Sequence, residues 1–143
     1  MINKVILLVE DNPIDEDLMI RALRRAKISS DVAVARDGAE ALDYVFSTGS
    51  YRDRGGALPC VVLLDLNLPK LSGFDVLQRI RSDPRTTELP VVILTSSSER
   101  QDVRGGYLAG ANSYVVKPVD SVAYFETVNR LGWYWLTVNT PMS

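Results

Sequence analysis

The sequence VVLLDLNLP, from Val61 to Pro69, places four apolar residues directly before an aspartate. Short apolar runs rich in β-branched residues are typical of strands that are buried on both faces of a parallel sheet. A carboxylate at the end of such a strand costs free energy unless it has partners. A lone aspartate in this place is usually a helix cap or a loop residue, so the role of Asp65 depends on what the other strand ends carry.

Apolar runs of the same kind recur along the chain, at residues 5–9, 32–35, 91–95 and 114–116. Between the runs lie segments with helical character, at residues 14–27, 37–47, 72–82, 98–109 and 119–136. Strands that alternate with helices predict an α/β fold. We expect a doubly wound (βα)₅ domain, in which helices cover both faces of a five-stranded parallel sheet.

The composition is that of a globular domain, with 143 residues of which 46% are apolar. This length suits one hydrophobic core, so we expect a single domain over residues 1–143 with a short aromatic tail at about 131–143. Residues 48–59 contain several Gly and Arg residues. They are expected to form a mobile surface insertion.

Several classes of function are disfavoured by composition. The net charge of −2 argues against a nucleic-acid surface, which usually shows a basic patch. The chain has no histidine, which excludes Ser-His-Asp triads, Cys-His pairs and His-rich zinc sites. Cys60 is the only cysteine, so no internal disulfide can form. The first apolar run is too short for a signal peptide or a bilayer span, so we expect a cytoplasmic protein without membrane contact.

Polar and charged side chains gather at the predicted strand ends. In an open parallel sheet, ligands bind at the carboxyl ends of the strands. The first, third, fourth and fifth strands can lie side by side in a doubly wound sheet. Their ends carry Glu10 and Asp11, then Asp65 and Asn67, then Thr95 and Ser96, and finally Lys117 and Pro118.

Clustered carboxylates repel one another unless a cation offsets their charge. Mg²⁺ prefers one or two carboxylates together with water, so it suits such a cluster. A metal ion, a lysine and a hydroxyl donor together suit phosphoryl transfer, whose transition state carries negative charge on its oxygens. An aspartate can act as the nucleophile and form an acyl phosphate, which is the role we assign to Asp65.

The sequence resembles a response-regulator receiver domain of two-component signalling, the CheY-like family. The motifs that carry the resemblance are LLVEDN at 7–12, LLDLNLPKLSG at 63–73, VVILTSS at 91–97 and YVVKPV at 114–119. Thr95 follows Asp65 by 30 residues and Lys117 follows it by 52, and both spacings match the family. The resemblance implies a flavodoxin-like sheet with the strand order 2-1-3-4-5.

The resemblance also implies a role for each matching residue. Asp65 is the phosphoryl acceptor, and Thr95 and Tyr114 are the switch residues that move on activation. The Lys117–Pro118 bond is expected to be cis. The implied Mg²⁺ site, in which Mn²⁺ or Ca²⁺ can substitute, consists of Glu10, Asp11, Asp65 and Asn67. The implied contacts to the phosphoryl group come from Leu66, Thr95, Ser96 and Lys117.

The C-terminal run LGWYWLTVNTP, at 131–141, is unusually aromatic. It resembles the end of single-domain regulators that are paired with bacterial phytochromes. This implies a phytochrome sensor kinase as the upstream partner, and another histidine kinase is the alternative. Consecutive apolar residues cannot all face the core, so we expect a homodimer through the last strand-helix face and the tail. The candidate contacts are Trp133, Tyr134, Trp135 and Leu136.

Three other interpretations compete with the receiver. A haloacid-dehalogenase-type phosphatase also uses an aspartate nucleophile, but it needs a second acid where this chain has Asn67. A receiver-like module that acts without phosphorylation would usually lack one of the acids or the lysine. A flavin binder would have a Gly-rich loop after the first strand, where this chain has the acidic stretch EDNPID.

Overall fold

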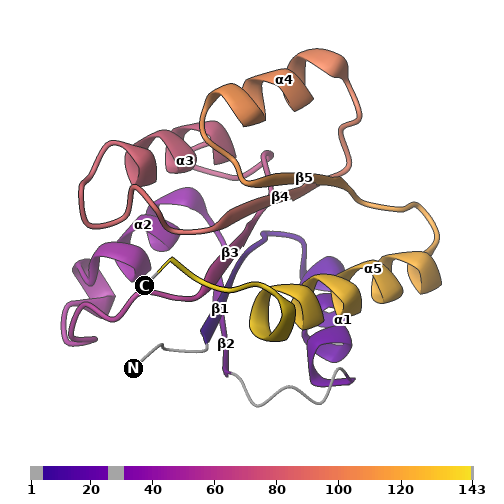
Figure 1. Ribbon diagram of the computed structural model, residues 1–143, viewed down its shortest axis with the longest axis horizontal. Coiled ribbons are helices and arrows are strands. Elements are labelled where there is room, and N and C mark those ends of the chain that lie inside the picture. Colours follow the sequence, from indigo (N-terminus) through magenta and orange to yellow (C-terminus); the bar gives the residue numbers. More distant parts are fainter. Residues whose placement is uncertain (1–4, 26–30, 143) are drawn as a thin grey trace.

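The computed structural model describes residues 5–25 and 31–142. Five parallel strands form one sheet in the order β2-β1-β3-β4-β5, which confirms the predicted fold (Figure 1). The register pairs Leu7 of β1 with Ala33 of β2 and with Val62 of β3. The strands are β1 (Val5–Val9), β2 (Asp31–Ala35), β3 (Val61–Leu64), β4 (Val91–Thr95) and β5 (Ser113–Val116).

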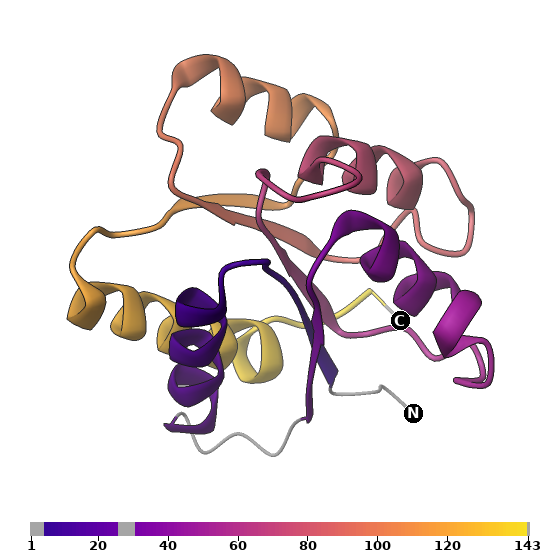
Figure 2. The same cartoon turned by 180° about the vertical axis from the view of Figure 1, so that it is seen from behind.

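Helices cover both faces of the sheet. Helices α1 and α5 lie together on one face, and α2, α3 and α4 lie on the other, as the two opposite views show (Figures 1 and 2). No helix among the described residues is long and apolar enough to cross a membrane. The helices are α1 (Pro13–Arg25), α2 (Gly38–Phe46), α3 (Gly73–Arg81), α4 (Arg100–Leu108) and α5 (Ser121–Trp133), with a 3₁₀ turn η1 (Gly49–Tyr51) and a π-helical turn η2 (Tyr134–Val138).

The alternation of side chains along the central strands divides the core into two layers. In β1, Ile6 and Leu8 pack toward α1 and α5, whereas Leu7 and Val9 pack toward α2 and α3. These four side chains are at most 1% exposed. Because both faces of the strand are buried, its sequence is a continuous apolar run rather than an alternating one.

Local capping explains where several helices begin. The Asn12 side chain accepts hydrogen bonds from the backbone N–H groups of Ile14 and Asp15, which caps α1 as its Asn-Pro sequence predicts. Ser72 and Asp75 form a reciprocal capping box at the start of α3. These caps place the first turns of both helices beside the carboxyl end of the sheet.

The predicted element boundaries differ from the observed ones at a few places. Helix α4 begins at Arg100 instead of Ser98, and the cap residue Glu99 makes no side-chain capping bond. Helix α5 is α-helical only to Trp133, after which the chain continues as a π-helical turn. The predicted end of the first helix, at residues 26–27, lies outside the described residues.

The segment 48–59, expected to be a mobile surface insertion, has side chains that bond to α2. The Arg54 guanidinium donates two hydrogen bonds to the carbonyl oxygen of Tyr44, at 3.1 and 2.6 Å, and lies 3.8 Å from the centre of the Tyr44 ring. The Tyr51 hydroxyl donates to Glu40 at 2.7 Å. Gly and Arg content alone did not indicate that these side chains would fold back onto the helix.

Replacing Arg54 with alanine is expected to lower the free energy of unfolding by about 1–2 kcal/mol, because two hydrogen bonds and a cation–π contact are lost. Urea unfolding monitored by circular dichroism measures the change. Arg52→Ala is the matched control, since Arg52 is exposed and makes only a 3.4 Å bond to Gly49; it should change the free energy by less than about 0.5 kcal/mol. Equal effects of the two substitutions would contradict the anchoring role of Arg54.

Candidate functional site

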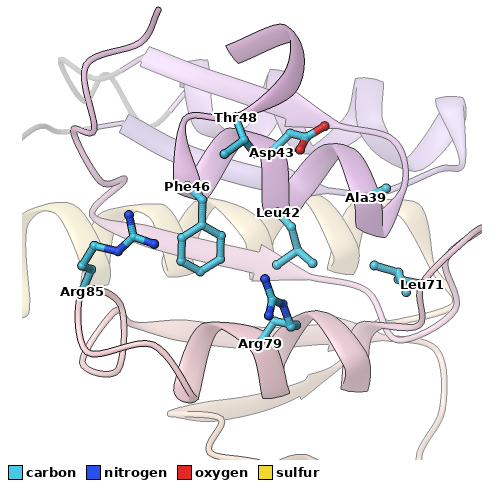
Figure 3. A pocket seen from close by; sticks show the side chains of 8 residues that line it. All are labelled: Ala39, Leu42, Asp43, Phe46, Thr48, Leu71, Arg79 and Arg85. Carbon is cyan, nitrogen blue, oxygen red and sulfur yellow. Dashed lines mark hydrogen bonds between the residues drawn. The ribbon is translucent and has the colours of Figure 1, made fainter. Parts of the chain in front are cut away.

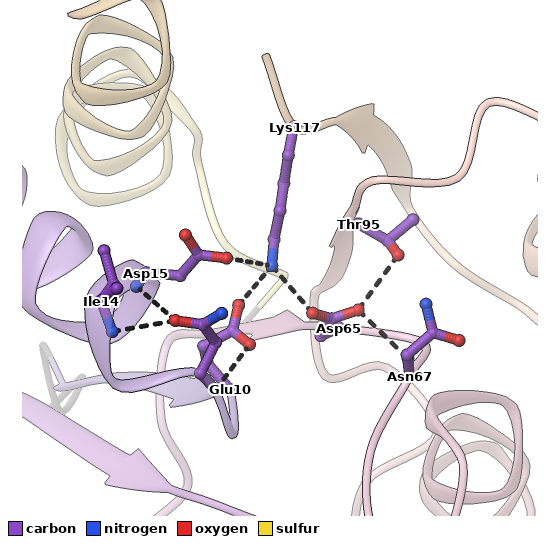
Figure 4. Close-up of polar contacts among 8 residues, drawn as sticks. Glu10, Ile14, Asp15, Asp65, Asn67, Thr95 and Lys117 are labelled. Carbon is purple, nitrogen blue, oxygen red and sulfur yellow. Dashed lines mark hydrogen bonds and ion pairs between the residues drawn. The ribbon is translucent and has the colours of Figure 1, made fainter. Parts of the chain in front are cut away.

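The carboxyl ends of the strands bring the predicted site residues together. Strand β3 lies between β1 and β4, so Asp65 has the acids that follow β1 on one side and Thr95 at the end of β4 on the other. Lys117 follows the edge strand β5, and its side chain reaches across the sheet edge to Asp65 (Figure 4). This adjacency follows from the strand order and explains how residues more than 100 positions apart share one site.

Both carboxylate oxygens of Asp65 are hydrogen-bonded. Oδ1 accepts a bond from the Thr95 hydroxyl at 3.0 Å and from the backbone N–H of Asn67 at 3.1 Å. Oδ2 accepts a bond from the Lys117 ammonium group at 2.8 Å. Asp65 is 7% exposed and Thr95 is fully buried. These partners offset the cost of a nearly buried carboxylate.

Lys117 is the centre of the site, because its ammonium group bonds to three carboxylates. The partners of Nζ are Glu10, Asp15 at 3.0 Å and Asp65 at 2.8 Å (Figure 4). The Lys117 side chain is only 8% exposed. Burial acts to lower its pKa, but the hydrogen bonds from Lys117 to Asp65 and Glu10 outweigh that effect and raise the pKa. Lys117 therefore carries a fixed positive charge.

Asp15 was not among the residues predicted for the site. It lies in the first turn of α1, where an acidic residue is usually explained by the helix dipole. The available signal was its position, because Asn12 and Pro13 start the helix and thereby place Asp15 beside the end of β1. Sequence reasoning that examined only strand ends could not find it.

Glu10 is 1% exposed, and burial raises its pKa to about 7. The hydrogen bond from Lys117 opposes this shift, and the neighbouring charge of Asp65 adds to it. Glu10 also accepts a hydrogen bond from the backbone N–H of Asn12 at 3.2 Å. The raised pKa is therefore mainly a consequence of burial, to which the nearby charge of Asp65 adds.

Glu10, Asp11 and Asp65 form a group suited to a metal ion. Each offers a carboxylate oxygen, and these oxygens lie within 4.8 Å of one another. Together with Asp15, the site has four carboxylates against the single charge of Lys117. Oxygen donors with an excess of negative charge fit a hard divalent cation such as Mg²⁺ or Mn²⁺.

The comparison with known proteins agrees with this geometry. The model of the response regulator receiver domain matches residues 6–129. The response regulator Rcp1 of Synechocystis is 37% identical over 96% of this chain and 93% of its own length. A protein of Methanothrix harundinacea named "Probable methanogenesis regulatory protein FilR2" is 40% identical over 94% of this chain and 85% of its own.

The chain belongs to the response regulator receiver family.

Two of the similar solved structures are of phytochrome response regulators. The phosphorylated cyanobacterial phytochrome response regulator RcpA has a TM-score of 0.92 and 37% identity, with 99% of each chain covered. The bacteriophytochrome response regulator AtBRR has a TM-score of 0.77 and 45% identity, covering 99% of this chain and 97% of its own. The Mn²⁺-bound form of Rcp1 has a TM-score of 0.91 and 35% identity, covering 98% and 99%.

The receiver's two expected switch residues are connected to the site in different ways. Thr95 already donates its hydroxyl to Asp65. The Tyr114 hydroxyl donates to the backbone carbonyl of Ser97 at 2.8 Å, so its half-buried ring lies beneath the β4–α4 loop. Gly106 of α4 leaves room for this ring, since a Cβ atom there would lie 3.1 Å from Tyr114.

The contacts predicted for Leu66 and Ser96 are with the phosphoryl group, and they stay predictions. The Asp65 carboxylate itself accepts a hydrogen bond from the backbone N–H of Asn67. Ser96 is exposed directly after Thr95. The predicted cis peptide at Pro118 is wrong, since no described peptide bond is cis. The trans form is intrinsically favoured, and Lys117 reaches all three carboxylates with it.

The C-terminal residues proposed as dimer contacts divide into two groups. Trp133 is 53% exposed and Tyr134 is 46% exposed. Leu136 is buried in the core between α1 and α5, and Trp135 packs against the same core. Leu136 is therefore wrong as a contact residue. The π-helical turn rotates it inward, a change that the sequence pattern did not indicate.

A separate hollow lies between α2 and α3 (Figure 3). Its volume is about 360 Å³, and the Phe46 ring at its centre has the guanidinium groups of Arg79 and Arg85 at 5.9 and 5.1 Å from its centroid. It contains none of the predicted site residues, and it is lined by Ala39, Leu42, Asp43, Phe46, Thr48, Leu71, Arg79 and Arg85.

Gly73 supports the backbone of the acceptor loop. A Cβ atom there would lie 2.3 Å from the carbonyl oxygen of Asp65 and 2.7 Å from Cα of Leu66. Both contacts are with backbone, which cannot move aside without shifting Asp65. Gly73 also donates its N–H to the Leu66 carbonyl at 2.9 Å. Close backbone approach therefore explains the glycine at this position.

Replacing Gly73 with alanine is expected to lower the free energy of unfolding by about 2 kcal/mol or more, because the added methyl overlaps backbone atoms. Gly105→Ala, inside α4, is the control. Its Cβ would meet only the Phe74 ring, at 3.3 Å, and alanine favours a helix. Urea unfolding should show no loss for the control, and equal stability of the two variants would contradict the assigned role of Gly73.

Proposed function

We propose that this protein is a phosphoryl-accepting response regulator in which Asp65 takes a phosphoryl group from a phosphohistidine of a sensor kinase. The observation that carries the proposal is the set of partners of Asp65. Its carboxylate ends a buried strand between the Thr95 hydroxyl and the Lys117 ammonium group, with the acids of β1 beside it. We also propose that the protein acts as a single receiver domain, with residues 131–143 as its tail.

In the reaction, a carboxylate oxygen of Asp65 forms a bond to phosphorus while the bond from phosphorus to the histidine nitrogen breaks. Negative charge develops on the phosphoryl oxygens. Lys117 offsets this charge, and the Thr95 hydroxyl donates a hydrogen bond to a phosphoryl oxygen. The backbone N–H groups of Leu66 and Ser96 are the further donors that we assign.

The proposed cation is Mg²⁺, held by the carboxylates of Glu10, Asp11 and Asp65 and by the backbone carbonyl of Asn67. When bound, Mg²⁺ supplies positive charge next to the transferred phosphoryl group. The Mn²⁺-bound form of the similar protein Rcp1 supports a divalent ion at this place. The chain's own acids bind and orient this charge, and Glu10 acts largely through water.

The switch is proposed to pass from Thr95 to Tyr114. Phosphorylation changes what Thr95 bonds to, and the β4–α4 loop that follows Thr95 carries the Ser97 carbonyl to which Tyr114 donates. A change at Asp65 thereby reaches the surface of α4, β5 and α5, where a partner can distinguish the two states. Asn67 and Ser97 are placed to influence the lifetime of the phosphoryl group.

For the input we propose a phytochrome-type histidine kinase. Similarity to RcpA and AtBRR along nearly the whole chain supports this assignment. The similarity to FilR2, whose name refers to methanogenesis, supports the alternative of a kinase without a phytochrome. The haloacid-dehalogenase reaction is disfavoured, because Asn67 cannot serve as the second acid that it requires.

For the output we propose a homodimer that uses the exposed aromatic residues of the tail. Trp133 is the last residue of α5 and Tyr134 the first of η2, and both are exposed, as is the nearby Val138 at 57%. Aromatic side chains on a surface are typical of protein contacts. We propose that the last strand-helix face, formed by β5 and α5, extends this contact.

Incubation with a small acyl phosphate donor and Mg²⁺ is expected to add one phosphoryl group, seen by intact-mass spectrometry. Asp65→Asn should remove the gain and leave the circular dichroism spectrum unchanged, because the amide replaces one carboxylate oxygen without a change of shape. Omission of Mg²⁺ should reduce labelling at least tenfold. Labelling of the Asp65→Asn protein to the same extent would contradict Asp65 as the acceptor.

The double substitution Trp133→Ala with Tyr134→Ala is expected to weaken the homodimer at least tenfold, because aromatic contacts commonly contribute more than about 1 kcal/mol each. Sedimentation equilibrium measures the dissociation constant. Leu108→Ala is the control, since Leu108 is 73% exposed on α4 and lies outside the tail. A monomeric unchanged protein at high concentration would overturn the dimer and leave the labelling experiment unaffected.

A further inference from the structure

Asp15 is the one partner of Lys117 that lies outside the group suited to a metal ion. Its Oδ2 atom is 3.0 Å from Nζ of Lys117, whereas the metal-binding group consists of Glu10, Asp11 and Asp65. We propose that Asp15 is a positioning residue for Lys117, which holds the ammonium group when a divalent cation occupies the oxygens of Glu10 and Asp65. The inference rests on the metal site of the proposed function.

The reason is a competition for the same two carboxylates, those of Glu10 and Asp65. The Lys117 ammonium group donates one hydrogen bond to each of Glu10, Asp15 and Asp65, so all three of its N–H groups are used. A cation that binds Glu10 and Asp65 takes up the charge that now holds the ammonium group there, and it repels the ammonium group directly. Without another partner, Lys117 would be a nearly buried charge without a counter-charge, which is costly.

The structure holds Asp15 in a position where it can remain the partner of Lys117. Its backbone N–H donates to the Asn12 side chain at 3.1 Å, so the first turn of α1 holds it in place. In Figure 4 it approaches Nζ from the side opposite to Asp65. Its side chain is 27% exposed, compared with 62% for Asp17 on the same helix. Asp17 pairs with Arg21 and represents the ordinary surface acid of α1.

Tyr124 of α5 is a second, independent sign that this side of the site is incomplete. The residue is 4% exposed, and its hydroxyl is the buried side-chain polar atom that has no hydrogen-bond partner within residues 5–25 and 31–142. The charges of Lys117 and Asp15 both act on this hydroxyl. Buried hydroxyls normally have a partner. Tyr124 thus has a hydroxyl donor that makes no bond among the described residues and on which the charges of Asp15 and Lys117 act.

The proposal predicts that Asp15 helps the cation to bind, although it is not a ligand. With Asp15 present, Lys117 can move toward it and release oxygens of Glu10 and Asp65. With an uncharged residue at position 15, Lys117 remains on those oxygens and competes with the cation. The effect of residue 15 on affinity must therefore depend on the presence of Lys117, whereas a simple field effect would not.

The test is a double-mutant cycle on the Mn²⁺ affinity of the full chain, measured by electron paramagnetic resonance of free Mn²⁺. Asp15→Asn is expected to weaken binding about fivefold when Lys117 is present, and less than twofold in a Lys117→Gln background. Asp17→Asn removes the same charge from the same helix and should stay within twofold of the unchanged protein. Circular dichroism confirms that each variant is folded.

Equal effects of Asp15→Asn with and without Lys117 would overturn the proposal, as would equal effects of Asp15→Asn and Asp17→Asn. The second comparison decides the matter if the Lys117→Gln protein does not fold. Because Mn²⁺ affinity is measured without a phosphoryl donor, failure of this inference is distinct from failure of Asp65 as the acceptor. No Mn²⁺ binding by the unchanged protein would contradict the metal site and this proposal together.

Discussion

The ammonium group of Lys117 is the charge on which the carboxyl end of the sheet depends. Glu10 and Asp65 are nearly inaccessible to water, and two carboxylates in such a place repel each other and lose hydration. Lys117 reaches them from the far edge strand and binds both, so the site exists only when β5 has joined the sheet. Four carboxylates, those of Glu10, Asp11, Asp15 and Asp65, gather around the single charge of Lys117. A site with more carboxylates than cationic groups is suited to binding a metal cation. The bound cation can then stabilise the negative charge of a phosphoryl group.

Much of the fold could be predicted because both the strands and the breaks between them have strong local causes. The run VVLLD is apolar on both faces, and Asn12-Pro13 and Ser72 cap helices through their own side chains. The site's members could be named because each follows a strand directly. The features that could not be predicted depend on contacts between residues that are distant in the sequence or that no local sequence pattern indicates. Asp15 lies in the first turn of α1 and not at a strand end, Leu136 packs into the core from the π-helical turn, and Arg54 folds back onto Tyr44.

The same geometry explains how a small chemical event could become a signal. Asp65 is bonded on one side to Thr95, which leads through the β4–α4 loop to Ser97 and Tyr114. On the other side it is bonded to Lys117, which leads to α1 through Asp15. A phosphoryl group on Asp65 would compete with both sets of bonds at once. The faces of α4, β5 and α5 on one side, and α1 on the other, are therefore coupled to one carboxylate.

The most direct test of this account is to identify the atom that carries the phosphoryl group. Reduction of the phosphorylated protein with borohydride converts an aspartyl phosphate to homoserine, and peptide mass mapping then locates it. The account predicts homoserine at position 65, in a peptide from the wild-type chain and only after incubation with donor and Mg²⁺. Homoserine at Asp11 or Asp15, or a phosphoryl group that resists reduction because it is on a hydroxyl, would contradict it.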